Sequence, residues 1–271
     1  MTVFEVSWGA ASHTGIVRDH NEDAWLAASR LFLVADGLGG HERGEVASRA
    51  VVDAFRRIAD DWLTGEKLRE ALLQASTTVA ALDREGRAPG STVVGVGLTE
   101  QPGPPCWLVF NVGDSRAYLL RGGSLEQISV DHSRVQELLD AGRQLSGPIS
   151  HNVITRAIGA GVPGPAAADQ WLVPATVGDR ILLCSDGLTT EVSDQLIAAA
   201  LLTFTDPQLA ADELVRSALT AGGRDNVTAL VVDVIAVDDA GIHGIEDDTI
   251  EDLSQVCEQA DTLEGPGADR S

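Results

Sequence analysis

Short apolar runs that end on an aspartate beside a glycine are the most regular feature of this chain. Three of them are Leu31–Asp36, Leu108–Asp114 and Ile181–Asp186, and a fourth aspartate, Asp225, lies just before the apolar run Val227–Ile235. An unbroken apolar run bounded by turn residues predicts a strand that is buried on both faces. The sequence therefore places four carboxylates beside buried strands that are far apart along the chain.

Apolar residues at three- and four-residue steps predict two pairs of helices. The first pair is Glu42–Trp62 and Leu68–Leu82, separated by a break at Gly65, and the second is Asp194–Leu202 and Pro207–Ala221. The apolar stripe of the first helix consists of Val46, Ala50, Val51, Ala54, Phe55 and Ile58. We interpret these stripes as surfaces that face the core, and not as a cofactor site.

Strand-like segments occupy most of the remaining chain, together with a short helix at Val135–Ala141 and a surface loop at Gly142–Asn152. The expected strands are Val3–Ser12, Ala24–Ala28, Leu31–Asp36, Ser91–Leu98, Trp107–Val112, Ala117–Arg121, Leu125–Ile128, Gln170–Val173, Arg180–Ser185 and Val227–Val237. This order lacks the regular strand–helix alternation of a doubly wound parallel sheet. We therefore expect an α+β fold of antiparallel sheets with the helices outside them.

The net charge and the cysteine spacing exclude some classes of protein and indicate a compartment. A formal net charge of −22 in 271 residues argues against nucleic-acid or anionic-membrane binding. Residues 238–271 carry a net charge of −10 without strong periodicity, so a disordered acidic tail is expected after a folded domain of residues 1–237. Scattered cysteines, no signal-like start and no apolar stretch of about 18 residues predict a cytoplasmic protein.

The four aspartates suggest a metal site. If the strand ends converge, Asp36, Asp114, Asp186 and Asp225 repel one another, and bound cations remove that repulsion. Carboxylates beside glycine-freed carbonyls favour magnesium or manganese over zinc, which prefers His and Cys. The polar loop Arg18–Asp23 is interpreted as part of this site or, alternatively, as an ordinary solvated loop.

Seven motifs carry a resemblance to a known family. They are Arg18-x-x-Asn-Glu-Asp23, Ala35-Asp-Gly-x-Gly-Gly40, Gly90-Ser-Thr92, Gly113-Asp-Ser-Arg116, Ile154-Thr-Arg-Ala-Ile-Gly159, Ser185-Asp-Gly-Leu188 and Gly223-Arg-Asp-Asn-Val-Thr228. In order and spacing they resemble the metal-dependent Ser/Thr protein phosphatases, the protein phosphatase 2C-like or PPM family, in its bacterial form. The resemblance covers about residues 5–236 and implies a four-layer αββα sandwich, two central antiparallel sheets flanked by helix pairs.

The resemblance also implies metal ligands. Two Mg²⁺ or Mn²⁺ ions are expected at one end of the sheets, with Asp36 as the bridging ligand and the Gly37 carbonyl on one ion. Asp186 and Asp225 resemble the ligands of the other ion. Asp114 matches the position that, together with Asp186, holds a third ion in bacterial members.

Further roles follow from the same resemblance. Glu22 and Asp23 would hold metal-bound waters, and Arg18 would clamp the substrate phosphate. Leu38 stands where many members outside bacteria have a histidine that resembles a general acid, so the proton donor stays open between His41 and another group. The loop Gly142–Asn152 falls where the family has its flap, and here it is shorter than in typical bacterial members.

The expected activity is hydrolysis of phosphoserine or phosphothreonine in proteins by a metal-activated water, opposing a Ser/Thr kinase. A cysteine nucleophile is disfavoured, because Thr190 stands where a Cys-x5-Arg motif starting at Cys184 needs arginine. Two alternatives stay open: a pseudophosphatase that only binds phosphoproteins, and a phosphatase of an anti-sigma-factor system.

The tail suggests a partner for what we expect to be a monomeric enzyme. Thr249 has Asp252 at its +3 position, a pattern that resembles phosphothreonine ligands of forkhead-associated domains. Phosphorylated Thr249 could tether the enzyme to its kinase's partners. The alternative is a tail that only increases solubility.

Overall fold

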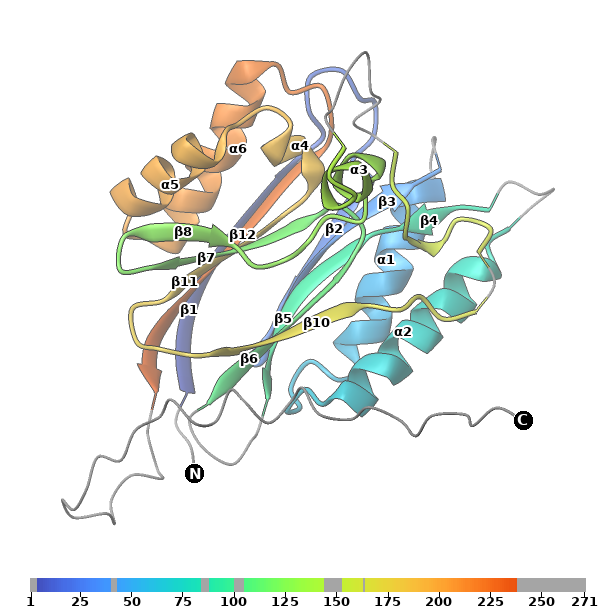
Figure 1. Cartoon of the computed structure of the whole chain (residues 1–271), viewed down its shortest axis with the longest axis horizontal. Coiled ribbons are helices and arrows are strands. Elements are labelled where there is room, and N and C mark those ends of the chain that lie inside the picture. The colour runs from blue at the N-terminus through green and yellow to red at the C-terminus, as the bar shows by residue number, and fades with distance from the viewer. Residues whose placement is uncertain are drawn as a thin grey trace, which may run out of the picture. The chain divides into compact units, whose positions relative to one another are not determined.

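Two antiparallel sheets form the centre of the first of two compact units, residues 1–239 (Figure 1). In this computed structural model the described residues are 4–39, 43–83, 88–99, 105–143, 153–162 and 164–237. The second unit, residues 240–271, lies outside them, as do Thr249, His41 and residues 144–152 of the predicted surface loop. The domain boundary at residue 237 therefore stays a prediction.

Each sheet is built from strands that are distant in sequence. The five-stranded sheet has the order β1 (Phe4–His13), β12 (Val227–Val237), β11 (Arg180–Cys184), β7 (Arg116–Arg121) and β8 (Ser124–Gln127). The seven-stranded sheet has the order β10 (Asp169–Pro174), β6 (Cys106–Val112), β5 (Val93–Thr99), β3 (Leu31–Leu38), β4 (Gly90–Ser91) and β9 (Ile158–Gly159), with β2 (Asp23–Ala27) paired to β3. Every described strand pair is antiparallel.

Helix pairs cover the outer faces of the two sheets (Figure 1). The helices α1 (Arg43–Arg56) and α2 (Gly65–Ala80) pack on the seven-stranded sheet, and α5 (Asp194–Thr203) and α6 (Pro207–Ala221) pack on the five-stranded sheet. The two remaining described helices are short: α3 (Arg134–Asp140) and α4 (Asp186–Thr189). The α+β fold with two antiparallel sheets between helix pairs is thus confirmed.

Three apolar layers explain why the strand sequences are apolar without a break. On β3, Leu31, Leu33 and Ala35 face the α1–α2 layer, whereas Phe32 and Val34 face the other sheet. Antiparallel strands usually alternate apolar and polar residues because one face meets water. Here both faces of β3 are covered by apolar layers, so its residues do not alternate between apolar and polar.

Some predicted boundaries were wrong. The first helix ends at Arg56, six residues before the predicted end at Trp62. Gly65 does not break a helix but begins α2, where the Thr64 hydroxyl caps the helix by accepting from Lys67 N–H. Val46, assigned to the core-facing stripe, is 47% exposed. No helix in the described ranges is long and apolar enough to cross a lipid bilayer.

A buried ion pair ties α5 to the five-stranded sheet. The guanidinium of Arg180 on β11 donates to both carboxylate oxygens of Asp233 on β12, each at 2.6 Å. It also donates to the carbonyls of Leu201, Phe204 and Thr205 at the end of α5. The side chain of Arg180 is 9% exposed, so its loss leaves both the carboxylate and these carbonyls without a partner.

We expect Arg180→Met to lower the free energy of unfolding by about 3–5 kcal/mol, because methionine keeps the apolar stem but leaves Asp233 buried and unpaired. Urea unfolding measures the change. Arg216→Met is the matched control, since Arg216 is 65% exposed and pairs with Glu213 on the surface of α6, where water screens the ion pair and its loss changes stability little. Equal stability of the two variants would contradict a structural role for Arg180.

Candidate metal centre

The candidate site begins where β2 and β3 pair. Asp23 and Asp36 lie directly opposite each other in this pair. Thr92 fixes the backbone of Asp36 from the other side: its hydroxyl accepts from Asp36 N–H at 3.0 Å, and its N–H donates to the Asp36 carbonyl at 2.8 Å. Near its end, β3 therefore holds one carboxylate in a fixed position, with a second beside it on β2.

Seven of the eight predicted site residues line one cavity of about 190 Å³. They are Arg18, Glu22, Asp36, Gly37, Asp114, Asp186 and Asp225. Leu38, Gly39, Ile154 and Asn226 complete the described lining. The strand ends thus converge as the repeated Asp-Gly pattern predicts.

Asp23, the eighth predicted residue, lies behind the cavity. One of its carboxylate oxygens accepts hydrogen bonds from the hydroxyls of Ser185 and Thr228, both at 2.7 Å. Ser185 directly precedes Asp186, and Thr228 lies on β12 two residues after Asn226. Asp23 therefore links the β2–β3 pair of one sheet to the strand ends of the other.

The carboxyl groups destabilise one another's ionised forms. Burial, followed by the charges of Asp23 and Asp186, raises the pKa of Asp36 well above its usual range. Burial, followed by the charge of Asp186, raises the pKa of Asp114 to about 7. Burial also raises the pKa of Asp23 to about 7 against its two hydroxyl partners, and burial with the Asp225 charge raises that of Asp186. Four acids with raised pKa values in one place are typical of a site that a cation completes.

Two buried carboxylate oxygens without a hydrogen-bond partner indicate whether these residues suit a cation. Oδ1 of Asp114 and Oδ1 of Asp23 are buried and have no hydrogen-bond partner, although buried polar atoms normally have one. Within the described ranges, no group of three or more His, Cys, Asp or Glu side chains is drawn together closely enough to hold an ion as it stands. The aspartates nevertheless line one cavity, and a hard cation takes oxygen ligands of this kind. The residues present fit Mg²⁺ or Mn²⁺.

Arg18 is the cationic side chain among the residues that line this cavity. Its Nη2 donates to Oδ2 of Asp225 at 2.7 Å, and the two side chains are 45% and 31% exposed. The predicted phosphate clamp thus contacts a predicted metal ligand. Both groups lie at the mouth of the cavity, where an anion can reach the guanidinium.

Close backbone packing brings the motif loops together. A Cβ at Gly37 would lie 2.2 Å from the carbonyl oxygen of Gly44, and one at Gly187 would lie 2.0 Å from that of Asn226. Side chains cannot be accommodated at these distances, so glycine is required beside Asp36 and Asp186. The same approach places Gly44 N–H 3.2 Å from the Glu22 carboxylate. Glu22 directly precedes β2, is 7% exposed and lines the cavity while accepting from the start of α1.

Asn226 has a positioning role that the sequence did not reveal. Its side-chain oxygen accepts from Glu22 N–H at 2.8 Å, and its amide donates to the carbonyls of Thr14 and His20. It thereby anchors the loop that carries Arg18. Asn226 is present in the last motif, but neither its spacing nor its composition indicates that it bonds to residues more than 200 positions away.

His132 is a second side chain whose role the sequence did not reveal. Its Nδ1 accepts from Gly113 N–H at 2.9 Å, which places the ring proton of the neutral form on Nε2, 3.1 Å from Asp169. Asp169 also accepts from Arg156. Gly113 has a φ of +117°, a conformation that favours glycine. The hydrogen bond from Gly113 to His132, together with the contact between His132 and Asp169, therefore fixes the turn that presents Asp114.

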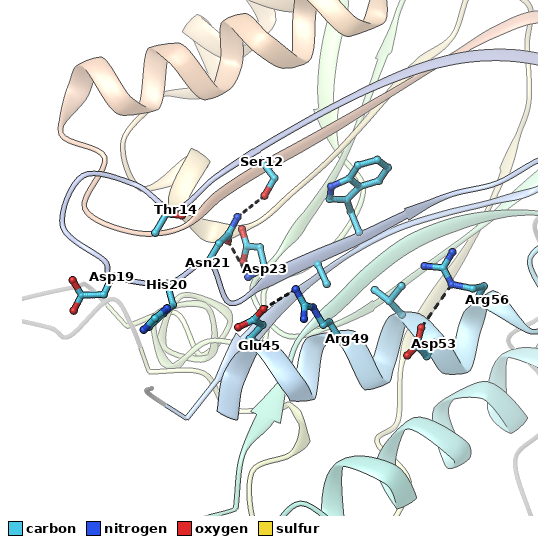
Figure 2. A pocket seen from close by; sticks show the side chains of 13 residues that line it. Ser12, Thr14, Asp19, His20, Asn21, Asp23, Glu45, Arg49, Asp53 and Arg56 are labelled. Carbon is cyan, nitrogen blue, oxygen red and sulfur yellow. Dashed lines mark hydrogen bonds and ion pairs between the residues drawn. The ribbon is translucent and has the colours of Figure 1, made fainter. Parts of the chain in front are cut away.

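A larger groove of about 710 Å³ lies on the other side of Asp23, between α1, β2 and the loop before it (Figure 2). Its charged side chains are largely paired within α1, Arg49 with Glu45 at 2.6 Å and Arg56 with Asp53 at 3.7 Å. Asn21 donates to Ser12 at 2.8 Å. Mixed charges that satisfy one another do not form a reactive centre, so the smaller, acid-lined cavity is the better candidate.

Comparisons with known proteins agree with this geometry. The family model described as protein phosphatase 2C matches residues 12–221. The chain is 39% identical over 243 residues to the serine/threonine protein phosphatase PstP of Mycobacterium tuberculosis, covering 85% of this chain but 45% of that protein. It is 33% identical over 241 residues to the serine/threonine phosphatase stp of Listeria welshimeri, covering 81% of this chain and 92% of the relative.

A solved structure shows the same fold. The catalytic domain of PstP in complex with two manganese ions superposes with a TM-score of 0.75 and 37% identity, covering 86% of this chain and 100% of that one. Because the family model spans most of the folded unit and these relatives exceed 30% identity, the chain belongs to the protein phosphatase 2C family.

Proposed function

We propose that this protein hydrolyses phosphoserine and phosphothreonine in proteins, using two Mg²⁺ or Mn²⁺ ions held at the ends of the two sheets. The observation that carries the proposal is the convergence of four aspartates in one cavity beside Arg18, where burial and neighbouring charges raise the pKa values of Asp36, Asp114 and Asp186. The manganese-bound relative supports the choice of metal. The alternative of a phosphoprotein-binding module receives no support from the site, because none of the predicted carboxylates is missing.

Asp36, Asp186 and Asp225 are the residues that would hold the two ions, with the Gly37 carbonyl, and Asp114 would add a ligand for a third. When bound, the ions provide Lewis acidity and lower the pKa of a coordinated water. The protein itself supplies position: Thr92 fixes the Asp36 backbone, and Asn226 fixes the loop that carries Arg18 and Glu22. Glu22 and Asp23 would orient water molecules bound to the ions.

Arg18 would bind the substrate phosphate through its planar guanidinium, which suits two oxygens at once. This local cation matters because the net charge of −22 repels a phosphate dianion. Leu38 carries no transferable proton, and His41 lies outside the described residues. The donor to the leaving serine or threonine oxygen therefore remains unassigned among the described groups.

The biological setting belongs to the same proposal. Phosphorylated proteins are the substrates, a Ser/Thr kinase opposes the enzyme, and the enzyme acts as a monomer in the cytoplasm. The scattered cysteines support a reducing compartment. Residues 1–237 form the catalytic domain, and the acidic tail tethers partners with forkhead-associated domains through phosphorylated Thr249. The tail's composition supports this tether and equally supports a purely solubilising tail.

We expect Asp36→Asn to reduce Mn²⁺-dependent hydrolysis of a phosphothreonine peptide by about 10³-fold or more, because the shared ligand of both ions is lost. With EDTA present, the variant should unfold at a temperature no lower than the wild-type protein, since the amide cannot carry the buried charge. Excess Mn²⁺ should then stabilise the wild-type protein, by about 2.7 kcal/mol at 100 times Kd, and the variant much less. Asp53→Asn, at a 74% exposed position, is the control. Retention of most activity in Asp36→Asn would disprove the two-metal assignment.

We expect Arg18→Ala to raise KM for a phosphopeptide, with some loss of kcat if the guanidinium contact tightens in the transition state. Arginine is cationic and cannot be a metal ligand, so calorimetric titration with Mn²⁺ should give the wild-type number of bound ions. Arg216→Ala, an exposed arginine on α6, controls for loss of surface charge. A loss of bound metal in Arg18→Ala would show that the contact with Asp225, and not phosphate binding, is its main role.

A further inference from the structure

A second cavity, of about 540 Å³, adjoins the metal-site cavity. Asp114 and Asp186 line both, so the two spaces meet at these side chains. Two short helices form its walls, and Figure 1 shows α3 beside α4 at the same end of the sheets. The wall residues are Val135, Gln136 and Leu139 of α3, and Thr189 and Thr190 at the end of α4.

The wall formed by α3 offers two apolar side chains, Val135 and Leu139, to a guest. The structure buries none of the residues of α3. Leu139 is 49% exposed, and Val135 is half-buried. An apolar side chain that covers Leu139 would therefore remove apolar surface from water, at roughly 25 cal/mol for each Å² covered.

Among the described residues that line this cavity, the charged side chains other than the proposed metal ligands, Arg116 and Asp131, are paired with each other. Asp131 accepts from Arg116 Nη2 at 2.7 Å and from Arg116 Nε at 2.9 Å, and also from Gln127. The remaining Nη1 of Arg116 donates to the hydroxyl of Tyr118 at 3.1 Å, which in turn donates to Asp194. A charged guest would lose water here without gaining a partner, which costs free energy.

We propose that this cavity is the subsite for an uncharged, apolar side chain next to the phosphorylated residue of the substrate. The inference rests on the proposed phosphatase function. A peptide whose phosphate lies between Arg18 and Asp36 continues in an extended form at roughly 3.3 Å per residue. Because Asp114 and Asp186 line both cavities, a side chain next to the phosphorylated residue can enter the adjoining space lined by Leu139 and Thr190. The enzyme therefore prefers phosphoproteins with an apolar residue at that position to those with a charged residue there.

Matched phosphothreonine peptides test the subsite. Each flanking position is set in turn to Leu, Lys or Asp, and kcat/KM is measured with Mn²⁺ present. We expect one position at which Leu is favoured over both charged residues by about 10-fold. Leu139→Asp should shift that preference toward the Lys peptide, and Leu139→Lys toward the Asp peptide. Because each ratio compares two peptides on one variant, a general loss of activity cancels.

Leu196→Asp is the matched control, since Leu196 lies on α5, is 61% exposed and does not line the cavity. It should keep the wild-type ratios. A wild-type enzyme without positional preference, or Leu139 variants that keep the wild-type ratios, would overturn the subsite while hydrolysis of p-nitrophenyl phosphate persists. Absence of hydrolysis of both p-nitrophenyl phosphate and the peptides would instead overturn the proposed function, and the subsite with it.

Discussion

Repulsion among buried carboxylates is the constraint on which the rest of this structure depends. Asp36, Asp114 and Asp186 all have pKa values raised by burial and by their acidic neighbours. A flexible loop would relieve that repulsion by moving apart. These groups cannot move far, because Asp36 lies near the end of β3, and Asp114 and Asp186 come two residues after β6 and β11. Both faces of these strands are packed into apolar layers. The sandwich supplies the rigidity, and the cations would supply the compensating charge.

The hydrogen bonds around the site also hold the carboxylates in place. Thr92 joins the Asp36 backbone to the Ser115 hydroxyl, and Ser115 follows Asp114. The carboxylate of Asp23 accepts hydrogen bonds from the hydroxyls of Ser185 and Thr228, so the two sheets are joined directly behind the cavity. Neutral donors of this kind stabilise carboxylates without adding positive charge that would compete with a cation. The polar groups nearest the site are thus positioned to orient ligands, while leaving the binding of charge to the ions and Arg18.

Much of the fold was predictable because its signals are local. The apolar runs predicted β3, β11 and β12, and Asp-Gly pairs marked the ends of the first two runs. The glycine turn between Arg121 and Ser124 predicted the hairpin of β7 and β8. The four-residue α4 was missed, because a turn and a single helical turn have the same sequence signal. Val46 was assigned to the wrong face, because the buried face of α1 begins with Gly44, Ala47 and Ser48, and glycine and serine give no apolar signal. The carboxylates of the site could be predicted, but the contacts made by Asn226 and His132 could not, because they depend on tertiary geometry.

Under the proposed function, the position of α3 would separate substrate selectivity from catalysis. The helix is held by its first turn: Ser133 caps it by accepting from Gln136 N–H, and Arg134 N–H donates to the Val153 carbonyl. Since none of its residues is buried, its outward residues can change without disturbing the apolar layers that hold the carboxylates. His132, one residue before the cap, nevertheless fixes the Gly113 turn and so Asp114. Under the proposed function, a substitution beyond Ser133 would therefore change which side chains the adjoining cavity accepts, whereas one at His132 would disturb the turn that presents Asp114.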